Sequence, residues 1–588
     1  GGLKKQRKPT AVVNVALNYQ PFEWLTFQGN YAANYWENHT SDFRKVVQTY
    51  KYDGSPYYRS PQKSTLNDQT SRNLRNLLTA SATFDKQFND HGIKAMVGYQ
   101  QEDHRYDMHK GYRENYAFPD YPVLDAGGEE NQKAYGNSYE WSLRSIFGRI
   151  NYDYQGKYLF EANMRYDGSS RFAEGNKWGI FPSVSAGWRI SEEAFWEPIR
   201  NIIDNLKFRA SWGQLGNQNV MNADNSAIDP YPFSSNVNLD TKYIFDKTIS
   251  SGAAITNMAN RKITWETTTS TDIGIDATLF GKLNITTDYF YKVTDDILMK
   301  LNVPLIIGMD APSQNAGKME NRGWEVSLSY ADQVGDFNYR ASFNISDVRN
   351  KILDMRGVNQ TGLTVNREGH EMYSIYGLEA IGYIQPEDYD ADGNYLGATQ
   401  YGNFGPGDIK YKDQNGDGVI NTSDYKIIGG TIPRYTFGLS LYGDYKGFDL
   451  SMLFQGVGKA DGYINGQGIQ TFIEGGTVQE QHKDYWTPEN RNAKFPRLAF
   501  NETNNMQNSS FWMKNAAYIR LKNVQLGYAL PKNVLRKTPI SYLRFYVSGD
   551  NLLTIDSFWD GFDVEAPIGN GGYYPQLKTI SFGVDLKF

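Results

Sequence analysis

The stretch TISFGVDLKF (579–588) alternates between apolar residues and residues that are polar or small. Its apolar members occupy every second position: Ile580, Phe582, Val584, Leu586 and Phe588. Successive side chains of a β-strand point to opposite faces, so this pattern predicts a strand with one apolar face and one polar face.

The same alternation recurs along the whole chain. In FNYRASFNIS (337–346), aromatic and aliphatic residues alternate with Asn, Arg and Ser. About seventeen segments share this pattern, and each is predicted to be a strand: 12–19, 24–36, 70–86, 91–106, 139–154, 157–167, 181–190, 206–213, 268–280, 283–294, 323–332, 336–347, 433–444, 447–456, 516–528, 542–551 and 577–588. Only 191–205 is expected to contain a short helix.

The connections between these segments alternate between short and long. The short ones include 21–23, 155–156, 281–282, 332–335 and 446–447, and the long ones are 37–69, 107–138, 214–267, 295–322, 348–432, 457–515 and 552–576. A soluble sandwich has no reason to sort its loops in this way, whereas a transmembrane barrel has short periplasmic turns and long extracellular loops. The sequence therefore predicts an all-β fold: a large antiparallel transmembrane β-barrel with apolar faces toward lipid and polar faces toward a wet lumen.

Composition is compatible with this fold and excludes other classes. The formal net charge of −6 gives no reason to expect a nucleic-acid partner, and the absence of cysteine excludes disulfides and thiolate metal sites. The mean hydropathy of −0.61 suits a soluble protein, but a membrane barrel also keeps a low value because only alternate residues face lipid. The 43 Tyr, 31 Phe and 12 Trp indicate either a β-rich protein in general or aromatic girdles at membrane interfaces.

Strand parity predicts where the ends of the chain lie. Single-chain bacterial barrels have an even number of strands, and about seventeen is odd. With the C-terminus placed in the periplasm, the first strand runs down from the outer face, and Gly1 is expected in an extracellular loop. The basic start GGLKKQRKPT is followed by an alternating segment and not by an apolar signal-peptide core. We therefore expect residues 1–588 to be the C-terminal part of a larger barrel.

The predicted loop 348–432 contains the chemical motif DQNGDGVINTSD (413–424). Numbered from Asp413, its oxygen donors fall at positions 1, 3, 5, 7, 9 and 12 of a calcium loop, with Gly418 at the sharp turn: Asp413, Asn415, Asp417, the Val419 carbonyl, Asn421 and Asp424. Position 12 is Asp and not Glu, which requires a closer approach of the backbone. The alternative is a series of Asx-turns without metal. A bound Ca²⁺ would stiffen the loop, and the related cluster at 388–394 is expected to be a plain turn.

Several stretches resemble the SusC-like family of TonB-dependent outer-membrane transporters of Bacteroidetes. They are GRINYDYQGKYLFEANMRYDGSSRFAEGNKWGIFPSVSAGWRISEEAFW (148–196), ASWGQLGNQ (210–218), WETTTSTDIGIDATLF (265–280), NRGWEVSLSY (321–330), GDIKYKDQNGDGVINTSDYKIIGGTIPRYTFGLSL (407–441), YIRLKNVQLGYALP (518–531) and YPQLKTISFGVDLKF (574–588). The terminal aromatic residue also resembles the C-terminal signature of bacterial outer-membrane proteins.

The resemblance implies a barrel of about 22 strands with a plugged lumen, of which this chain supplies about seventeen. In the family, the plug, an N-terminal extension and the TonB box precede the barrel, so these parts and roughly five strands of the barrel are expected outside this chain. The resemblance further implies outer-membrane lipid as surroundings, a SusD-like lipoprotein that caps the extracellular mouth, energy from TonB–ExbB–ExbD, and oligosaccharides or peptides as substrates.

No motif points to an enzyme: GxSxG, P-loop and HExxH patterns do not occur in the sequence. Aromatic residues expected in loops could stack on a substrate, although packing between loops is an equally good explanation. These candidates are Tyr112, Tyr116, Tyr121, Tyr231 and Tyr243. His104 and His109 are expected in a solvated loop.

The function predicted from the sequence is active import across the bacterial outer membrane. One alternative is a secreted soluble β-rich protein that binds or degrades glycans and carries a dockerin-like calcium loop. The other alternative is a passive porin with the same architecture.

Overall fold

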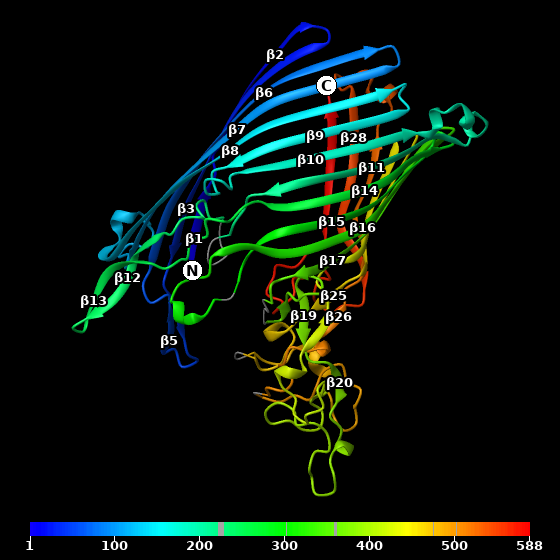
Figure 1. The fold of residues 1–588 in the computed structure, drawn as a ribbon. Helices are drawn as coiled ribbons and strands as arrows, with labels where there is room; N and C mark the ends of the chain where they lie inside the picture. The colour runs from blue at the N-terminus through cyan, green and yellow to red at the C-terminus, as the bar shows by residue number, and fades with distance from the viewer. Residues whose placement is uncertain (222–227, 302, 358–361, 474–475, 501) are drawn as a thin grey trace. The chain divides into compact units, whose positions relative to one another are not determined.

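The computed structural model describes residues 1–221, 228–301, 303–357, 362–473, 476–500 and 502–588. Strands dominate these residues, and the one α-helix among them is the short α1 (Lys532–Leu535) (Figure 1). None of the described helices is both long and apolar enough to span a membrane. The chain divides into two compact units, residues 1–187, 211–269 and 295–316 in the first and residues 188–210, 270–294 and 317–588 in the second.

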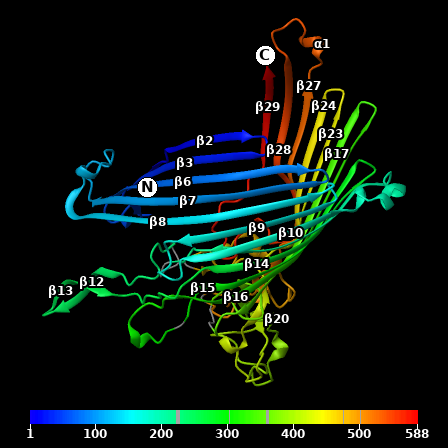
Figure 2. The same cartoon turned by 45° about the horizontal axis from the view of Figure 1, so that its top comes forward.

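Long antiparallel strands build the first unit. Consecutive ladders join β2 (Thr10–Phe22) to β3 (Leu25–Arg44), β3 to β6 (Thr65–Phe88), β6 to β7 (His91–Glu114), β7 to β8 (Gly128–Tyr154) and β8 to β9 (Tyr158–Ser169). These strands lie side by side in both Figure 1 and Figure 2.

The alternation did not identify β1 (Gly2–Arg7), which also pairs with β3. β1 runs along Arg44–His39 and β2 along Trp36–Leu25, so the two follow the same edge of β3. The interruption between them contains Pro9, which has no backbone N–H to donate, while its carbonyl accepts the N–H of Glu37 at 3.0 Å. The expected loop before the first strand is therefore itself strand from Gly2 onward.

A second series of ladders builds the second unit. β16 (Ser313–Val334), of which residues from Lys318 onward take part, pairs with β17 (Phe337–Asp354), followed in order by β23 (Arg434–Tyr445), β24 (Phe448–Lys459), β27 (Tyr518–Ala529), β28 (Tyr542–Asp556) and β29 (Thr579–Lys587). The other long strands are β10 (Trp178–Arg189), β11 (Ile203–Asn217), β14 (Glu266–Leu279) and β15 (Leu283–Lys300). Each segment predicted to be a strand coincides with one of these elements, although most strands continue beyond the predicted limits.

The alternation of connections is also confirmed. Two-residue turns such as Gln155–Gly156, Phe280–Gly281 and Lys446–Gly447 have positive φ at both positions, the conformation that matches the twist of paired strands. Two connections on the short side are longer, at 190–202 and 530–541. The first contains the 3₁₀ helices η2 (Ile190–Glu192) and η3 (Ala194–Ile199), so the short helix predicted within 191–205 is present as a 3₁₀ helix.

Several long connections contain small sheets that the sequence analysis missed. They are formed by β4 (Val47–Tyr50) with β5 (Pro56–Ser60), β12 (Val237–Phe245) with β13 (Thr248–Ile255), β19 (Ser374–Gly377) with β18 (Thr364–Val365) and β22 (Lys426–Gly429), β20 (Ala380–Tyr383) with β21 (Ile409–Tyr411), and β25 (Asp461–Tyr463) with β26 (Met513–Asn515).

Aromatic rings gather around the short turns of the first unit. Phe22 stacks on Trp24 with ring centroids 5.0 Å apart, and Trp24 lies 5.6 Å from Phe84 on the neighbouring strand. Across the next turns, His91 lies 4.9 Å from Tyr154, which stacks on Tyr158 at 6.3 Å. Such rings at one level of a sheet are typical of the girdle that marks a membrane interface.

The apolar face of the first unit becomes charged farther from these turns. On β7, this face carries Val97 and Tyr99 and then Gln101, Asp103 and Arg105. The apolar part of this face runs from the turn 89–90 to Tyr99. This length is about the 9–11 residues that a tilted strand needs to cross a bilayer. The strands β6, β7 and β8 continue well beyond this length, so their outer halves project past the apolar band.

The edge of the apolar band carries tyrosines whose hydroxyls turn toward the polar side. Tyr31 donates to Asn76 Oδ1 at 3.0 Å, and Tyr99 donates to Gln101 Oε1 at 2.9 Å. Beyond them, the same face has cross-strand ion pairs, including Arg72 with Glu37 at 3.0 Å. An apolar ring ending in a hydroxyl suits the boundary between lipid and water.

Candidate functional site

Three long connections of the second unit share one hydrophobic core. These connections are residues 355–433, 460–517 and 557–578. Val457 near the end of β24 and Tyr518 at the start of β27 also contribute to the core. The fully buried rings of Trp512 and Trp559 lie near each other, with centroids 6.3 Å apart. We call this assembly the loop domain. The sequence predicts one long loop at 348–432, and in the structure this loop packs against two others.

An ion pair between a half-buried arginine and a fully buried carboxylate joins two of these connections. Arg497 donates from Nε to Asp408 Oδ1 at 2.8 Å and from Nη2 to Asp408 Oδ2 at 2.7 Å. Asp408 is fully buried and also accepts the side-chain amide of Asn505 and the backbone N–H of Gly405, both at 2.8 Å. Four donors therefore satisfy a carboxylate that would otherwise be costly to bury.

The third connection is fixed to the barrel strand β27 by Arg520. Its side chain is 2% exposed and donates to Glu565 Oε2 at 2.6 Å and to Asp563 Oδ2 at 2.7 Å. Charge-assisted hydrogen bonds to two carboxylates orient the Arg520 guanidinium and compensate its buried positive charge. The strand end and the loop 557–578 are therefore held together.

The calcium-like loop 413–424 lies within the loop domain and is closed on itself. Asp413 accepts the backbone N–H groups of Gly416 at 2.7 Å and Gly418 at 2.9 Å. These hydrogen bonds, that from Gly418 above all, hold the pKa of the Asp413 carboxyl below its usual range. Asp424 is fully buried and accepts the N–H groups of Gln414 and Asn421.

The remaining predicted ligands also make local hydrogen bonds. Asn415 Oδ1 accepts the N–H of Asp417, and Asp417 Oδ1 accepts the N–H of Val419, both at 2.9 Å. The amide of Asn421 donates to the Val419 carbonyl at 3.1 Å, so the Asn421 side chain would have to turn to offer its oxygen to an ion. Over the described residues, no group of three or more His, Asp or Glu side chains is placed to hold a metal. A calcium loop also uses amide and carbonyl oxygens, so the Ca²⁺ site stays a prediction.

The five candidate tyrosines lie on separate elements. Tyr112 belongs to β7 and not to a loop, and its hydroxyl donates to Glu114 at 3.1 Å. Tyr116 is buried edge-on against Phe43, and Tyr121 is exposed. The Tyr231 hydroxyl accepts the backbone N–H of Glu140 at 3.1 Å, and Tyr243 on β12 lies 4.8 Å from Phe245. The contacts of Tyr116 are packing contacts, and the role of the five in substrate binding stays a prediction.

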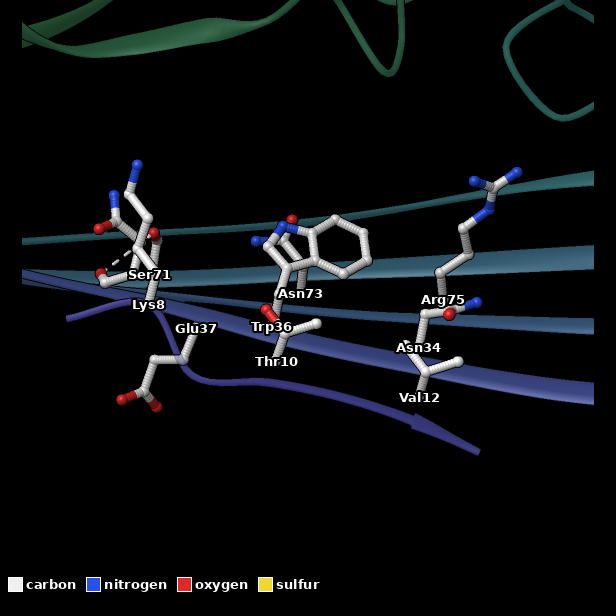
Figure 3. A pocket seen from close by; sticks show the side chains of 10 residues that line it. Lys8, Thr10, Val12, Asn34, Trp36, Glu37, Ser71, Asn73 and Arg75 are labelled. Atoms are coloured by element: carbon white, nitrogen blue, oxygen red, sulfur yellow. Dashed lines mark hydrogen bonds between the residues drawn. The ribbon is translucent and has the colours of Figure 1, made fainter. Parts of the chain in front are cut away.

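The loop predicted for His104 and His109 was also wrong, because both residues belong to β7. His104 is buried on the polar face, with ring centroids 5.8 Å from Trp36 on β3 and 5.4 Å from Trp141 on β8. Next to this row is a cavity of about 590 Å³, which we call the Trp36 pocket (Figure 3). It is lined by Lys8, Thr10, Val12, Asn34, Trp36, Glu37, Asn38, Ser71, Asn73 and Arg75. Sequence analysis missed this pocket because its residues come from three strands, β2, β3 and β6, and from Lys8 just before β2.

Comparison with known proteins agrees with the fold. A family model described as "TonB dependent receptor-like, beta-barrel" matches residues 6–552. The chain therefore belongs to the TonB-dependent receptor β-barrel family, and its relatives show that it is SusC-like. This family and the strand architecture indicate the bacterial outer membrane as its location.

Three relatives illustrate the extent of the similarity. TonB-dependent receptor P26 of Formosa agariphila is 32% identical, with 76% of this chain and 46% of that protein covered. TonB-dependent receptor P3 of the same organism is 31% identical, with 88% and 53% covered. TonB-dependent receptor SusC of Bacteroides thetaiotaomicron is 28% identical, with 76% and 44% covered. The chain thus spans about half the length of the curated relatives it matches.

Solved structures show the same fold. The RagAB peptide importer in its "closed-closed" state matches with a TM-score of 0.81 and 24% identity, covering 100% of this chain and 63% of that chain. Its "open-open" state matches with a TM-score of 0.82 and 23% identity, with 100% and 62% covered.

Proposed function

We propose that the protein imports nutrients actively through the outer membrane, as a SusC-like transporter driven by TonB–ExbB–ExbD. The observation that carries the proposal is the change along the apolar face of the first unit, from Val97 and Tyr99 to Asp103 and Arg105. A face that is apolar for one bilayer thickness and charged beyond it suits a wall that crosses a membrane.

The proposal includes the parts that the relatives have in addition to this region. A plug in the lumen would close the pathway until TonB displaces it, and a SusD-like lipoprotein would cap the extracellular mouth. The SusC-like resemblance supports a lipoprotein partner, and the loop domain offers a preformed surface at the loop end of the strands. The C-terminus is proposed to be periplasmic, with the long loops outside.

The substrates are proposed to be oligosaccharides or peptides too large for passive diffusion. The alternative of a soluble secreted protein is disfavoured by the match to a β-barrel family over residues 6–552. A passive porin remains the competing function. It differs from active import because its flux would not depend on the proton-motive force.

Uptake in cells tests the proposal against the porin. Cells that carry the gene are grown on the nutrient that induces it, with and without TonB, and the import of fluorescently labelled oligosaccharides and peptides is measured. Active import predicts that uptake is lost without TonB and after a proton uncoupler. Equal uptake under all three conditions would establish a porin instead.

The loop 413–424 is proposed to bind one Ca²⁺ that stiffens the loop domain. Support comes from the spacing of its oxygen donors. Calcium titration of the purified protein, followed by calorimetry, should show a site that is lost in the double variant Asp413→Ala, Asp417→Ala. A matched control is Asp390→Ala in the related cluster, which is expected to leave the titration unchanged. Identical titrations for wild type and the double variant would contradict the Ca²⁺ site and favour a series of Asx-turns without metal.

A further inference from the structure

We propose that the Trp36 pocket binds a sugar ring of an oligosaccharide, with the ring stacked on the Trp36 indole. This inference deepens the proposed import function and rests on it, because it names a substrate class and a subsite on the import pathway. The lining of this pocket shares no residue with the loop domain or with the five tyrosines.

The pocket lies on the polar face of the first unit. Thr10 on β2 pairs with Trp36 on β3, which pairs with Asn73 on β6, so the three side chains project from the same face. Figure 3 shows Trp36, Asn73 and Arg75 pointing to one side of the sheet and Glu37 to the other. In a barrel wall whose opposite face meets lipid, this side faces the lumen.

The pocket also lies beyond the apolar band. On the opposite face, the neighbours of Trp36 in sequence are Tyr35 and Glu37, and Tyr35 donates its hydroxyl to Glu37 at 3.0 Å. Glu37 in turn pairs with Arg72, above the level of Tyr31 and Asn76. Trp36 is therefore at the height where the wall has left the bilayer, near the entrance that an external substrate meets first.

The Trp36 indole is supported from one side by a rigid row of rings. His104 lies between Trp36 and Trp141, and its Nε2 contacts Asn73 Oδ1 at 3.2 Å. Arg171 stacks over the Trp141 ring at 4.9 Å and closes the row. His104 is 9% exposed, and its Nδ1 has no hydrogen-bond partner within the described part of the chain.

The surroundings of His104 favour an uncharged imidazole between the two indole rings. Burial, together with the charges of Arg75 and Arg171, lowers the pKa of the His104 imidazole, while Glu102 acts in the opposite direction. The lowered pKa favours the neutral form of the ring. A neutral aromatic row can order Trp36 without adding charge to the site.

The polar lining suits hydroxyl groups. Asn34, Asn38 and Asn73 offer amides that both donate and accept, and Thr10 and Ser71 add hydroxyls. The lining contains two cations, Lys8 and Arg75. Arg75 is already paired with Glu102, with 2.6 Å between Arg75 Nε and Glu102 Oε1. A pyranose has one face of C–H groups for the indole and a rim of hydroxyls for these partners, which is the combination of apolar platform and few polar groups seen in ligand sites.

A peptide fits the same surface less well. Extended peptides are held mainly by main-chain hydrogen bonds to an unpaired strand edge. Beneath the pocket, β3 and β6 are paired on both sides, so their backbone groups are already used. Over β3 and β6, a peptide would have to rely on side-chain amides alone, which favours a carbohydrate at the Trp36 ring.

Trp36→Ala in the full-length protein tests the inference. Binding of hexasaccharides of β-1,4-glucose, α-1,4-glucose, β-1,4-xylose and β-1,4-mannose and of a pool of tryptic peptides is measured by calorimetry. The hexasaccharide that wild type binds best should lose about tenfold in affinity, because stacking disappears. Trp36→Phe, which keeps a ring, should recover most of this loss. Tyr35→Ala is the matched control, since it removes a ring from the adjacent residue on the opposite face.

Three outcomes would overturn the inference. They are equal hexasaccharide affinity for Trp36→Ala and wild type, a loss in Tyr35→Ala as large as in Trp36→Ala, and binding of wild type to the peptide pool but to none of the hexasaccharides. TonB-dependent uptake is measured in the same strains, so that the two proposals can fail separately. Energy-dependent uptake together with unchanged affinity in Trp36→Ala would remove the sugar subsite and leave the importer in place.

Discussion

Asp408 and Arg497 lie 89 residues apart in the sequence and meet in a two-pronged ion pair, with N–O distances of 2.8 and 2.7 Å. The pair joins the connection between β17 and β23 to the connection between β24 and β27. This contact and the shared hydrophobic core show that the long connections of the second unit form a packed domain. Its stability can therefore be tested separately from that of the strands.

Arg497→Ala should loosen the loop domain. The change leaves the fully buried Asp408 carboxylate without its counter-ion, which typically costs about 3 kcal/mol, and less here because Asn505 and Gly405 still donate to it. Limited proteolysis of the protein in membranes should give faster cleavage within 386–512 than in wild type. Lys483→Ala, which removes the exposed pair with Glu480, should leave the cleavage rate unchanged. Equal rates for both variants would mean that the buried pair does not hold the loops.

Trp512→Ala should unfold much of the loop domain while the barrel strands persist. Trp512 is 2% exposed, packs 6.3 Å from Trp559 and donates its indole N–H to the Asn505 carbonyl at 3.0 Å. Truncating such a residue costs about 3–5 kcal/mol. Hydrogen exchange should rise in 374–429 and stay low in β23 and β24, whereas Leu396→Ala, at an exposed position, should change neither. Uniform loss of protection in strands and loops would show that the domain is not a separate unit of stability.

Acid should weaken the attachment of β22 through Glu379. Hydrogen bonds from Lys426 and Gln414 lower the pKa of the Glu379 carboxyl from 4.5 to about 2. A lowered folded-state pKa contributes stability that is fully present above pH 4.5 and is lost as the pH falls from 4.5 toward 2. Hydrogen exchange of 374–429 should therefore accelerate over that range in wild type. Glu379→Gln cannot titrate, so its exchange should lack this component, and identical pH profiles would contradict the assignment.

An arginine placed in the apolar band should impair membrane assembly. Val97→Arg puts a charge on the lipid-facing side of β7, where Arg near the bilayer midplane costs about 2–4 kcal/mol. Leu74→Arg is the matched control on the same face of β6, because its cross-strand partner is Arg105 in the charged part. The folded fraction is measured from the heat-modifiable mobility of the barrel on gels. Equal assembly of the two variants would mean that the band is not at the level of the lipid.

The strands could be predicted because water and lipid impose a two-residue period wherever one face is apolar. Where both faces become polar, the period carries no signal, and for this reason the predicted strand 91–106 ended before Glu114 and His109 was placed in a loop. The segment Gly2–Arg7 was missed for the same reason, since Lys4, Lys5 and Arg7 leave no apolar face.

The candidate sites differ in how far sequence reasoning could reach. The donor spacing of 413–424 is a local property, so it could be seen in the sequence, and the structure adds that these groups already bond to their own backbone. The sequence could not tell packed tyrosines from exposed ones, because only tertiary packing distinguishes the buried Tyr116 from the exposed Tyr121. The Trp36 pocket gave no signal, since neighbours across strands are set by the register of several ladders.

The sequence by itself determined that this protein is a membrane-crossing wall of strands, because each residue meets either lipid or water and its polarity records which one. Only the tertiary structure decided that three distant loops form one domain around Trp512 and that Trp36 stands beside Asn73 and His104. Those contacts depend on which segments meet in space. Side chains that are buried together in a loop core, or that share one face across several strands, follow no regular spacing in the sequence. Such contacts therefore cannot be predicted from periodicity.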